Sequence, residues 1–170
     1  MHKAALDYTY NTFMDWRTHN YYDYKKFDIL EIGSLNINGG ARELLEPHAE
    51  TYLGIDMQEG PGVDLVADAT KFTKPDSFDV VVCNEVFEHL KEWPTIVYNA
   101  MVSLREGGIF IATMAGEGRP PHSAIDENPI REWEWYANVG EWHLMQVLKG
   151  FFEQAQVSPL GHDMRCWAVK

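Results

Sequence analysis

Four apolar runs of this sequence end on a carboxylate or an amide, and these side chains are its first candidates for chemistry. They are Glu31, Asp56, Asp68 and the pair Asn84 and Glu85. If the runs are parallel strands of one sheet, their carboxyl ends lie on the same side of the domain and the acids converge on one crevice. A ring of carboxylates favours a ligand with hydroxyls, amino groups or a cationic centre, and it repels a pyrophosphate.

The first of these runs opens an α/β unit. Phe27–Ile32 is apolar, with β-branched and aromatic residues, which predicts a strand covered on both faces. A turn rich in Ser, Asn and Gly follows at 34–40, and then a helical patch at 41–46, with Asn38 as its expected cap. Gly33 lacks a Cβ, so backbone and ligand can approach closely there. Strand, turn and helix in this order indicate a nucleotide-like ligand at the carboxyl end of the strand.

The rest of the chain predicts a Rossmann-like, doubly wound α/β sheet that is mostly parallel and has seven strands. Further strands are expected at 51–56, 63–67, 78–83 and 108–113, helices at 94–104 and 141–149, and a terminal antiparallel hairpin of 151–157 with 164–169. We expect Arg105 in the last turn of the helix 94–104 and Gly107 as its end.

Two segments flank this sheet. Residues 1–26 hold an amphipathic helix, 4–17, and a loop with Tyr21, Tyr22 and Tyr24 that either lines a pocket mouth or only connects. The helix is expected to pack at the sheet edge in preference to forming a lid.

The irregular segment 114–138 is longer and more aromatic than a connector requires, and it is expected on the substrate side. Trp133, Trp135 and Tyr136 form either an acceptor-binding wall or a small core of their own. His122 is the one candidate for a catalytic base, with a loop histidine in solvent as the alternative.

Composition limits the classes of protein. A chain of 170 residues that is 45% hydrophobic is one globular domain, here 1–170. A net charge of −12 argues against nucleic acid, which requires clustered Lys and Arg. No apolar run reaches the roughly 20 residues of a membrane helix, and the first residues do not read as a signal peptide. Two cysteines indicate a reducing, cytoplasmic environment.

These segments, in this order and spacing, resemble a class I S-adenosylmethionine-dependent methyltransferase of the small type 11 kind. The resemblance covers about 27–170 and is carried by Leu30–Ser34, Tyr52–Asp56, Asp68 with Ala69, Phe78–Glu85 with Glu88–Leu90, and Leu104–Gly108. Leu35 and Ile37 stand where the family often has glycines. Because the G-x-G-x-x-G pattern is also missing, the same segment argues against a nicotinamide-binding fold.

The resemblance implies that S-adenosylmethionine is the cofactor and S-adenosylhomocysteine the product. In this family pattern Gly33, Ser34 and Leu35 pass under the methionine part of the cofactor. Glu31 orients that turn and faces the sulfonium side.

The same resemblance assigns the other end of the cofactor. Asp56 holds the ribose hydroxyls and Met57 packs on adenine. Asp68, with the backbone of Ala69, accepts the adenine amino hydrogen. Asn84 and Glu85 border the methionine end and the methyl group.

The acceptor is expected to be a small molecule, with a protein side chain as a further option; nucleic acid and membrane partners are not expected, and no pattern fixes the oligomeric state. A catalytically silent cofactor-binding or regulatory module is the alternative function. Glu85-x-x-Glu88-His89 has metal-ligand types but lacks the second histidine of helix-borne zinc motifs, so no metal is expected.

Overall fold

A computed structural model of the chain describes residues 3–20, 25–37, 39–126 and 128–170. The tyrosines Tyr21, Tyr22 and Tyr24 and the expected helix cap Asn38 lie outside these described residues.

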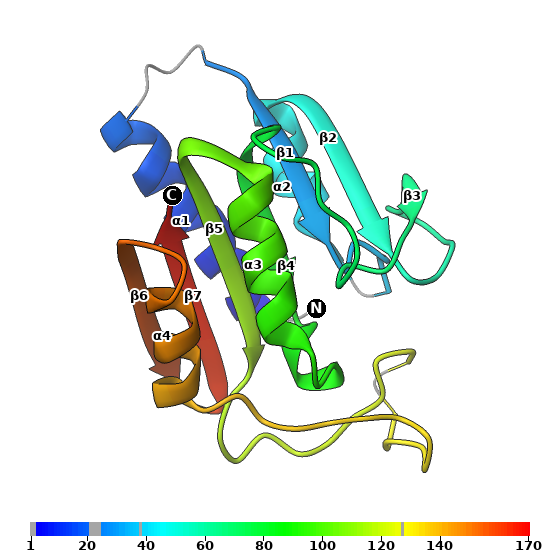
Figure 1. Ribbon diagram of the computed structural model, residues 1–170. Helices are drawn as coiled ribbons and strands as arrows, with labels where there is room; N and C mark the ends of the chain where they lie inside the picture. The colour runs from blue at the N-terminus through cyan, green and yellow to red at the C-terminus, as the bar shows by residue number, and fades with distance from the viewer. Residues whose placement is uncertain (1–2, 21–24, 38, 127) are drawn as a thin grey trace.

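Seven strands form one sheet in the order β3-β2-β1-β4-β5-β7-β6 (Figure 1). All neighbouring pairs from β3 to β5 are parallel, while β7 runs antiparallel to both β5 and β6. The doubly wound sheet with a terminal hairpin is therefore confirmed. The strands are β1 (Phe27–Ile32), β2 (Ala49–Asp56), β3 (Leu65–Val66), β4 (Phe78–Asn84), β5 (Leu104–Ala115), β6 (Gln154–Leu160) and β7 (Asp163–Val169).

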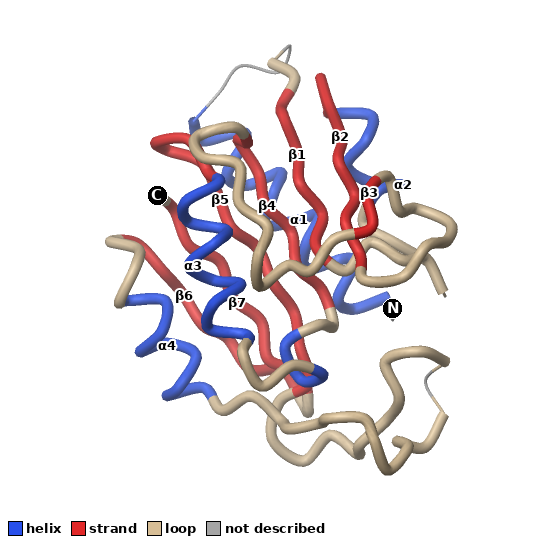
Figure 2. The backbone as a smooth tube through the Cα atoms, turned by 45° about the vertical axis from the view of Figure 1, so that its right-hand side comes forward, coloured by secondary structure: helices blue, strands red, loops and turns tan. Residues whose placement is uncertain are grey.

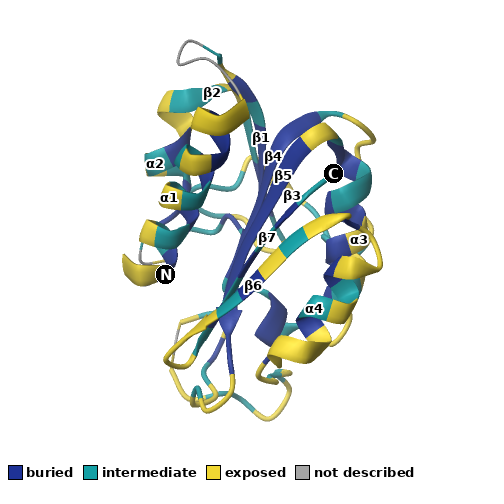
Figure 3. Ribbon diagram, turned by 90° about the vertical axis from the view of Figure 1, so that its left-hand side faces the viewer, coloured by how far each residue is buried: buried dark blue, intermediate teal, exposed yellow. Residues whose placement is uncertain are grey.

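Helices cover both faces of the sheet (Figure 3). On one face lie α1 (Lys3–Asn20) and α2 (Arg42–Leu45), and on the other lie α3 (Trp93–Ser103) and α4 (Glu141–Lys149). Two short 3₁₀ turns, η1 (Glu46–His48) and η2 (Phe87–His89), follow α2 and β4. Each face has its own apolar core, and every residue of β4 is buried between the two.

The N-terminal helix packs differently from the prediction. Phe13 and Trp16 of α1 are buried against Phe27, at ring-centroid distances of 5.7 and 5.3 Å. They belong to the core that includes Val80 and Ile111 of the central strands. The helix therefore lies across the face of the sheet and not at its edge, because its apolar stripe is wide enough to cover several strands.

Two boundaries also differ from prediction. The helix α3 ends at Ser103, and β5 begins directly at Leu104. Arg105 is therefore a strand residue, and its guanidinium pairs with Asp28 at 2.8 Å and Asp79 at 3.0 Å. These two ion pairs hold Arg105 in β5, so it does not belong to the last turn of α3.

The terminal hairpin is shifted along the chain. The register pairs Leu160 with Asp163, so β6 spans 154–160 where 151–157 was expected. Gly161 has φ +60° in the tight turn, a conformation that suits glycine. Phe152 is buried against Phe110 before the strand starts, which explains why the apolar pair 151–152 suggested an earlier start.

Candidate functional site

A cavity of about 490 Å³ opens at the carboxyl ends of β1, β2 and β4. Its size suits a small organic ligand or cofactor. Eight of the ten residues predicted to bind the cofactor line it: Gly33, Leu35, Asp56, Met57, Asp68, Ala69, Asn84 and Glu85. The loop 116–140 extends past the same ends of the strands (Figure 2), and it contributes Arg119, His122 and Ala124 to the lining.

The turn after β1 packs tightly at Gly33. This residue has φ +76°, and a Cβ built on it would lie 2.3 Å from Cγ2 of Val86. Both the backbone conformation and the contact exclude a side chain here. The loop after β4 can therefore lie directly against the turn, and the two segments form adjacent walls of the cavity.

The backbone N–H groups of this turn are donated within the protein. Ile55 O accepts two of them, at 2.9 and 3.1 Å, Asp56 Oδ2 accepts one at 3.2 Å and Pro61 O accepts one at 2.8 Å. The four donors are consecutive, Gly33, Ser34, Leu35 and Asn36. A turn that binds a pyrophosphate presents such N–H groups to the ligand. This turn instead faces the cavity with the side chain of Leu35 and with Gly33.

Glu31 lies behind the turn and does not line the cavity. Its side chain is 2% exposed, accepts the hydroxyl of Tyr52 at 2.8 Å and accepts the N–H of Ala41 at 3.2 Å. Burial raises the pKa of Glu31 to about 7 against those two stabilising hydrogen bonds. Glu31 thus connects β1 and β2 to the start of α2. Its expected place on the sulfonium side of the cofactor stays a prediction, because its side chain is directed at Tyr52 and Ala41 and not at the cavity.

Ser34 is also buried and does not line the cavity, although it was expected to contact the cofactor. Its hydroxyl has no hydrogen-bond partner among the described residues.

Asp56, the last residue of β2, and Asp68, which follows β3, line the cavity and are held by contacts from nearby loop residues. Asp56 accepts the N–H of Gln58 at 3.0 Å, besides that of Leu35. Asp68 accepts the hydroxyl of Thr70 at 2.6 Å and pairs with Lys71 at 2.9 Å. These contacts, that of Thr70 first, lower the pKa of Asp68 to about 2, so it is ionised at neutral pH.

Met57 directly follows Asp56 and is 70% exposed. A large apolar side chain on a cavity wall gives a flat ligand a surface to pack on.

Asn84, the last residue of β4, and Glu85, which follows it, form one wall of the cavity. Asn84 Oδ1 accepts the hydroxyls of Thr9 and Thr113, each at 3.1 Å. Its Nδ2 is buried and has no partner in the described part of the chain. Glu85 has φ +55°, and its carboxylate also lies 3.1 Å from the Thr113 hydroxyl, so it shares the single proton of that hydroxyl with Asn84. The contact with Thr9 also connects α1 to this wall.

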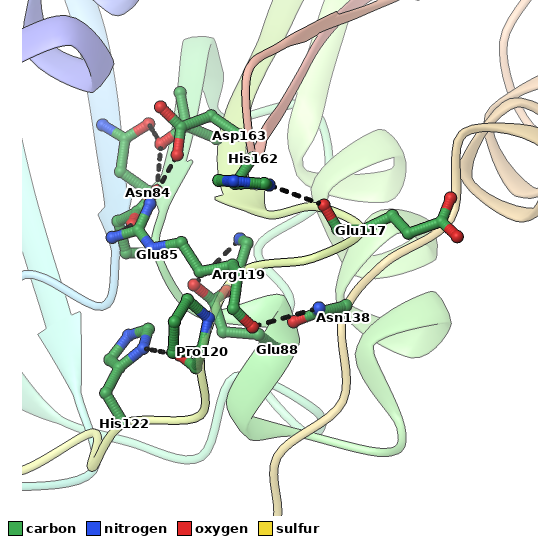
Figure 4. A network of polar contacts seen from close by, with 12 residues as sticks. Asn84, Glu85, Glu88, Glu117, Arg119, Pro120, His122, Asn138, His162 and Asp163 are labelled. Atoms are coloured by element: carbon green, nitrogen blue, oxygen red, sulfur yellow. Dashed lines mark hydrogen bonds and ion pairs between the residues drawn. The ribbon is translucent and has the colours of Figure 1, made fainter. Parts of the chain in front are cut away.

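Arg119 is the one guanidinium among the described residues that line the cavity. It lies between Glu85, at 3.4 Å, and Asp163, with which it forms a close ion pair (Figure 4). The side-chain amide of Asn138 donates to the Arg119 carbonyl at 3.1 Å, which connects the two ends of the long loop.

His122 lines the cavity and is part of a ring cluster. Its ring centroid is 5.0 Å from that of His89 and 5.1 Å from that of Tyr136. Burial, then the neighbouring His122, lowers the pKa of His89 to about 4, so His89 is neutral at physiological pH. Burial, then the charge of Glu85, raises the pKa of Glu88.

Two cavity residues, His89 and Arg119, were not assigned a role from sequence. His89 belongs to Glu85-x-x-Glu88-His89, whose metal-ligand types were noted but led to no expected metal site, and Arg119 stands three residues before His122. Those residue types and that proximity were the local signals that could have pointed to them.

Comparison with known proteins is consistent with this geometry. Residues 30–112 match a family model described as a methyltransferase domain. No curated protein matches the sequence. None of the described helices is both long and apolar enough to cross a membrane.

Solved structures share the fold at low sequence identity. A Burkholderia thailandensis 1,6-didemethyltoxoflavin-N1-methyltransferase, with its substrate and S-adenosylhomocysteine bound, has a TM-score of 0.67 at 15% identity and covers 92% of this chain and 75% of its own. An S-adenosylmethionine-dependent methyltransferase from Mesorhizobium loti has a TM-score of 0.65 at 16% identity, covering 97% and 100%. A Haemonchus contortus phosphoethanolamine N-methyltransferase 2 has a TM-score of 0.61 at 19% identity, covering 87% and 38%.

Proposed function

We propose that this chain, whose residues 30–112 are a domain of the methyltransferase family, transfers a methyl group from S-adenosylmethionine to a small-molecule acceptor. Its sheet order and terminal hairpin are those of the S-adenosylmethionine-dependent methyltransferases. The acceptor and the residue roles that follow are our proposals.

The proposal depends mainly on the hydrogen bonding of the turn after β1. Its four N–H groups are already donated to Ile55, Asp56 and Pro61, so none is directed at a phosphate. The lining also carries the carboxylates of Asp56, Asp68 and Glu85. A cavity of this kind favours a cationic nucleoside without phosphates, which describes S-adenosylmethionine, over a dinucleotide.

The cavity residues fit the parts of that cofactor. Asp56 has carboxylate lone pairs left to accept the ribose hydroxyls, and Met57 offers its exposed side chain to the adenine face. Asp68 and the backbone of Ala69 lie at the end of β3, where they would bind the adenine amino group. The unpartnered Nδ2 of Asn84 would donate to the methionine carboxylate.

The remaining predicted residues lie in the turn after β1, behind that turn, or after β4. Gly33 and Leu35 would form the floor beneath the methionine part, and Glu85 would lie near the methyl group. Glu31 and Ser34 would act from behind, Glu31 by holding the turn and α2 in place.

The cofactor brings an activated methyl group, so the protein mainly positions and desolvates the reactants. His122 and Arg119 lie on the wall that the long loop contributes and would face the acceptor. A small acceptor fits, since one similar structure holds 1,6-didemethyltoxoflavin and another phosphomonomethylethanolamine. A protein side chain remains the second kind of acceptor that an open cavity admits.

Isothermal titration calorimetry with S-adenosylmethionine and S-adenosylhomocysteine tests this proposal. We expect one site per chain and a loss of affinity of about tenfold or more in Asp56→Asn, because a hydrogen bond to a charged acceptor contributes about 1.5–3 kcal/mol. Asp76→Asn is the matched control, since Asp76 pairs with Lys170 at the opposite end of β4. Absence of binding by the wild-type protein would refute the proposal.

A measurement of methyl transfer distinguishes the enzyme from the alternative, a catalytically silent module. Transfer of labelled methyl groups to a panel of hydroxyl, amine and ring-nitrogen compounds is expected from an enzyme. Tight cofactor binding without transfer to any of them would instead favour a silent cofactor-binding or regulatory module.

A further inference from the structure

Three side chains of metal-ligand type meet beside the cavity, two of them in its lining. Glu88, His89 and His122 each present one ligand atom, and these atoms lie within 4.8 Å of one another. Glu88 and His89 belong to the 3₁₀ turn after β4, and His122 comes from the loop after β5. The second histidine, which the sequence segment around Glu88 lacks, is thus supplied by a distant part of the chain.

Glu88 is fully buried, and only one of its two carboxylate oxygens is used. Oε1 accepts the N–H of Ala115 at 3.0 Å, whereas Oε2 has no partner among the described residues. A buried carboxylate oxygen is normally matched by a donor or a cation. The open oxygen therefore points independently to a missing ligand.

The contacts of His122 leave one ring nitrogen ready to bind. Its Nδ1 lies 3.2 Å from the carbonyl of Pro120 (Figure 4). Because a carbonyl can only accept, Nδ1 carries the proton and Nε2 keeps its lone pair. Metal-ligating histidines are commonly oriented by such a contact on the other nitrogen. Tyr136 packs edge-on against both His122 and His89 and fixes the two rings.

The charges around the cluster favour a cation. Arg119 is engaged with Glu85 and Asp163. When all are ionised, Glu85, Asp163 and Glu88 carry three negative charges and Arg119 carries one positive charge. A divalent cation would neutralise the remaining net charge of two.

We propose that Glu88, His89 and His122 bind one divalent first-row transition-metal ion, for which Zn²⁺ is the natural probe. Two imidazoles and one carboxylate favour such an ion over Mg²⁺ or Ca²⁺, which prefer oxygen ligands. Atoms up to 4.8 Å apart share a centre about 2.8 Å from each, and metal bonds of about 2.0–2.2 Å require a small inward rotation of the side chains.

The site leaves a position open to the cavity, since His89 and His122 both line it. An oxygen or nitrogen of the acceptor would bind the metal there; this role, unlike the site itself, rests on the proposed methyl transfer.

Metal binding is tested with the untagged, full-length protein, freed of metal by a chelator and titrated with Co²⁺ and Zn²⁺ alone. We expect one ion per chain, visible absorption from bound Co²⁺, and displacement by Zn²⁺. His122→Gln and Glu88→Gln are each expected to weaken binding by at least about tenfold. His162→Gln is the matched control, because its Nδ1 also contacts a loop carbonyl, that of Glu117 at 3.1 Å, but lies outside the cluster.

Circular dichroism establishes that each variant is folded, and His122→Gln, on the cavity rim, keeps the test open if Glu88→Gln unfolds. Lack of saturable binding by the wild-type protein, or equal affinity of wild type and His122→Gln, overturns the metal site. Titration of S-adenosylmethionine in the presence of the chelator is measured separately, so failure of the metal site and failure of the proposed function are distinguishable.

Discussion

Replacing Glu31 by Gln tests the buried connection behind the cofactor turn. The carboxyl is 2% exposed, and burial raises its pKa from 4.5 to about 7. A raised carboxyl pKa means that the native state binds the proton more tightly than the unfolded state does. The stabilisation is complete below pH 4.5 and is lost as the pH rises through 7.

The magnitude follows from the shift. At about 1.4 kcal/mol per pH unit, Glu31 lowers the free energy of unfolding by about 2–3 kcal/mol between pH 5 and pH 8. Gln cannot titrate, but its amide oxygen can still accept the Tyr52 hydroxyl. The free energy of unfolding of Glu31→Gln, relative to that of the wild type, is therefore expected to rise by about 2–3 kcal/mol from pH 5 to pH 8.

Urea unfolding of wild type and variant at pH 5, 6, 7 and 8 measures this difference. Other titrating groups cancel because they are common to both proteins. Glu43→Gln, on the exposed side of α2, is the control and should show no such trend. A stability difference between wild type and Glu31→Gln that stays constant with pH would show that the Glu31 carboxyl has the same pKa in the native and unfolded states.

Three further results are expected. Gly33→Ala should lower the free energy of unfolding by more than about 2 kcal/mol in urea, because its Cβ would clash with Val86 at a positive φ, whereas Gly140→Ala, with nothing within 4 Å, should change little; equal stabilities would contradict the close packing. The His89 ring, followed by NMR in a chelator, should titrate near pH 4; a midpoint near the ordinary 6.5 would show that it is not desolvated. Arg119→Gln should lower the free energy of unfolding by about 1–3 kcal/mol in thermal unfolding, because it removes the guanidinium that pairs with Glu85 and Asp163, and no change would contradict the two ion pairs.

The sheet was predictable because its central strands are apolar runs. Strands β1 and β4 are buried on both faces, and nine of their 13 residues are hydrophobic, so both strands stand out as apolar runs. The register of the hairpin was not predictable. Residues 158–160 include Ser and Pro, which are not typical of a strand, and they belong to β6 because they pair with β7. The start of β5 was missed because partners distant in sequence, Asp28 and Asp79, hold Arg105 there.

Some residues of the site were likewise predictable from the sequence and others were not. Acids at the ends of parallel strands must lie at one edge, so the approach of Asp56, Asp68 and Glu85 followed from the order of the elements. Glu31 differs because the direction of its side chain depends on Tyr52 and α2, which the strand pattern does not reveal. The meeting of His89 with His122 depends on how a long loop folds back, and no local pattern records that.

We propose that the cavity at the ends of β1, β2 and β4 holds S-adenosylmethionine. A crystal structure of the protein with S-adenosylhomocysteine would locate the cofactor site. We expect the ribose hydroxyls within hydrogen-bond distance of Asp56, the adenine amino group at Asp68 and the sulfur toward Glu85. A nucleoside bound elsewhere, or one that contacts none of these acids, would show that this cavity is not the cofactor site.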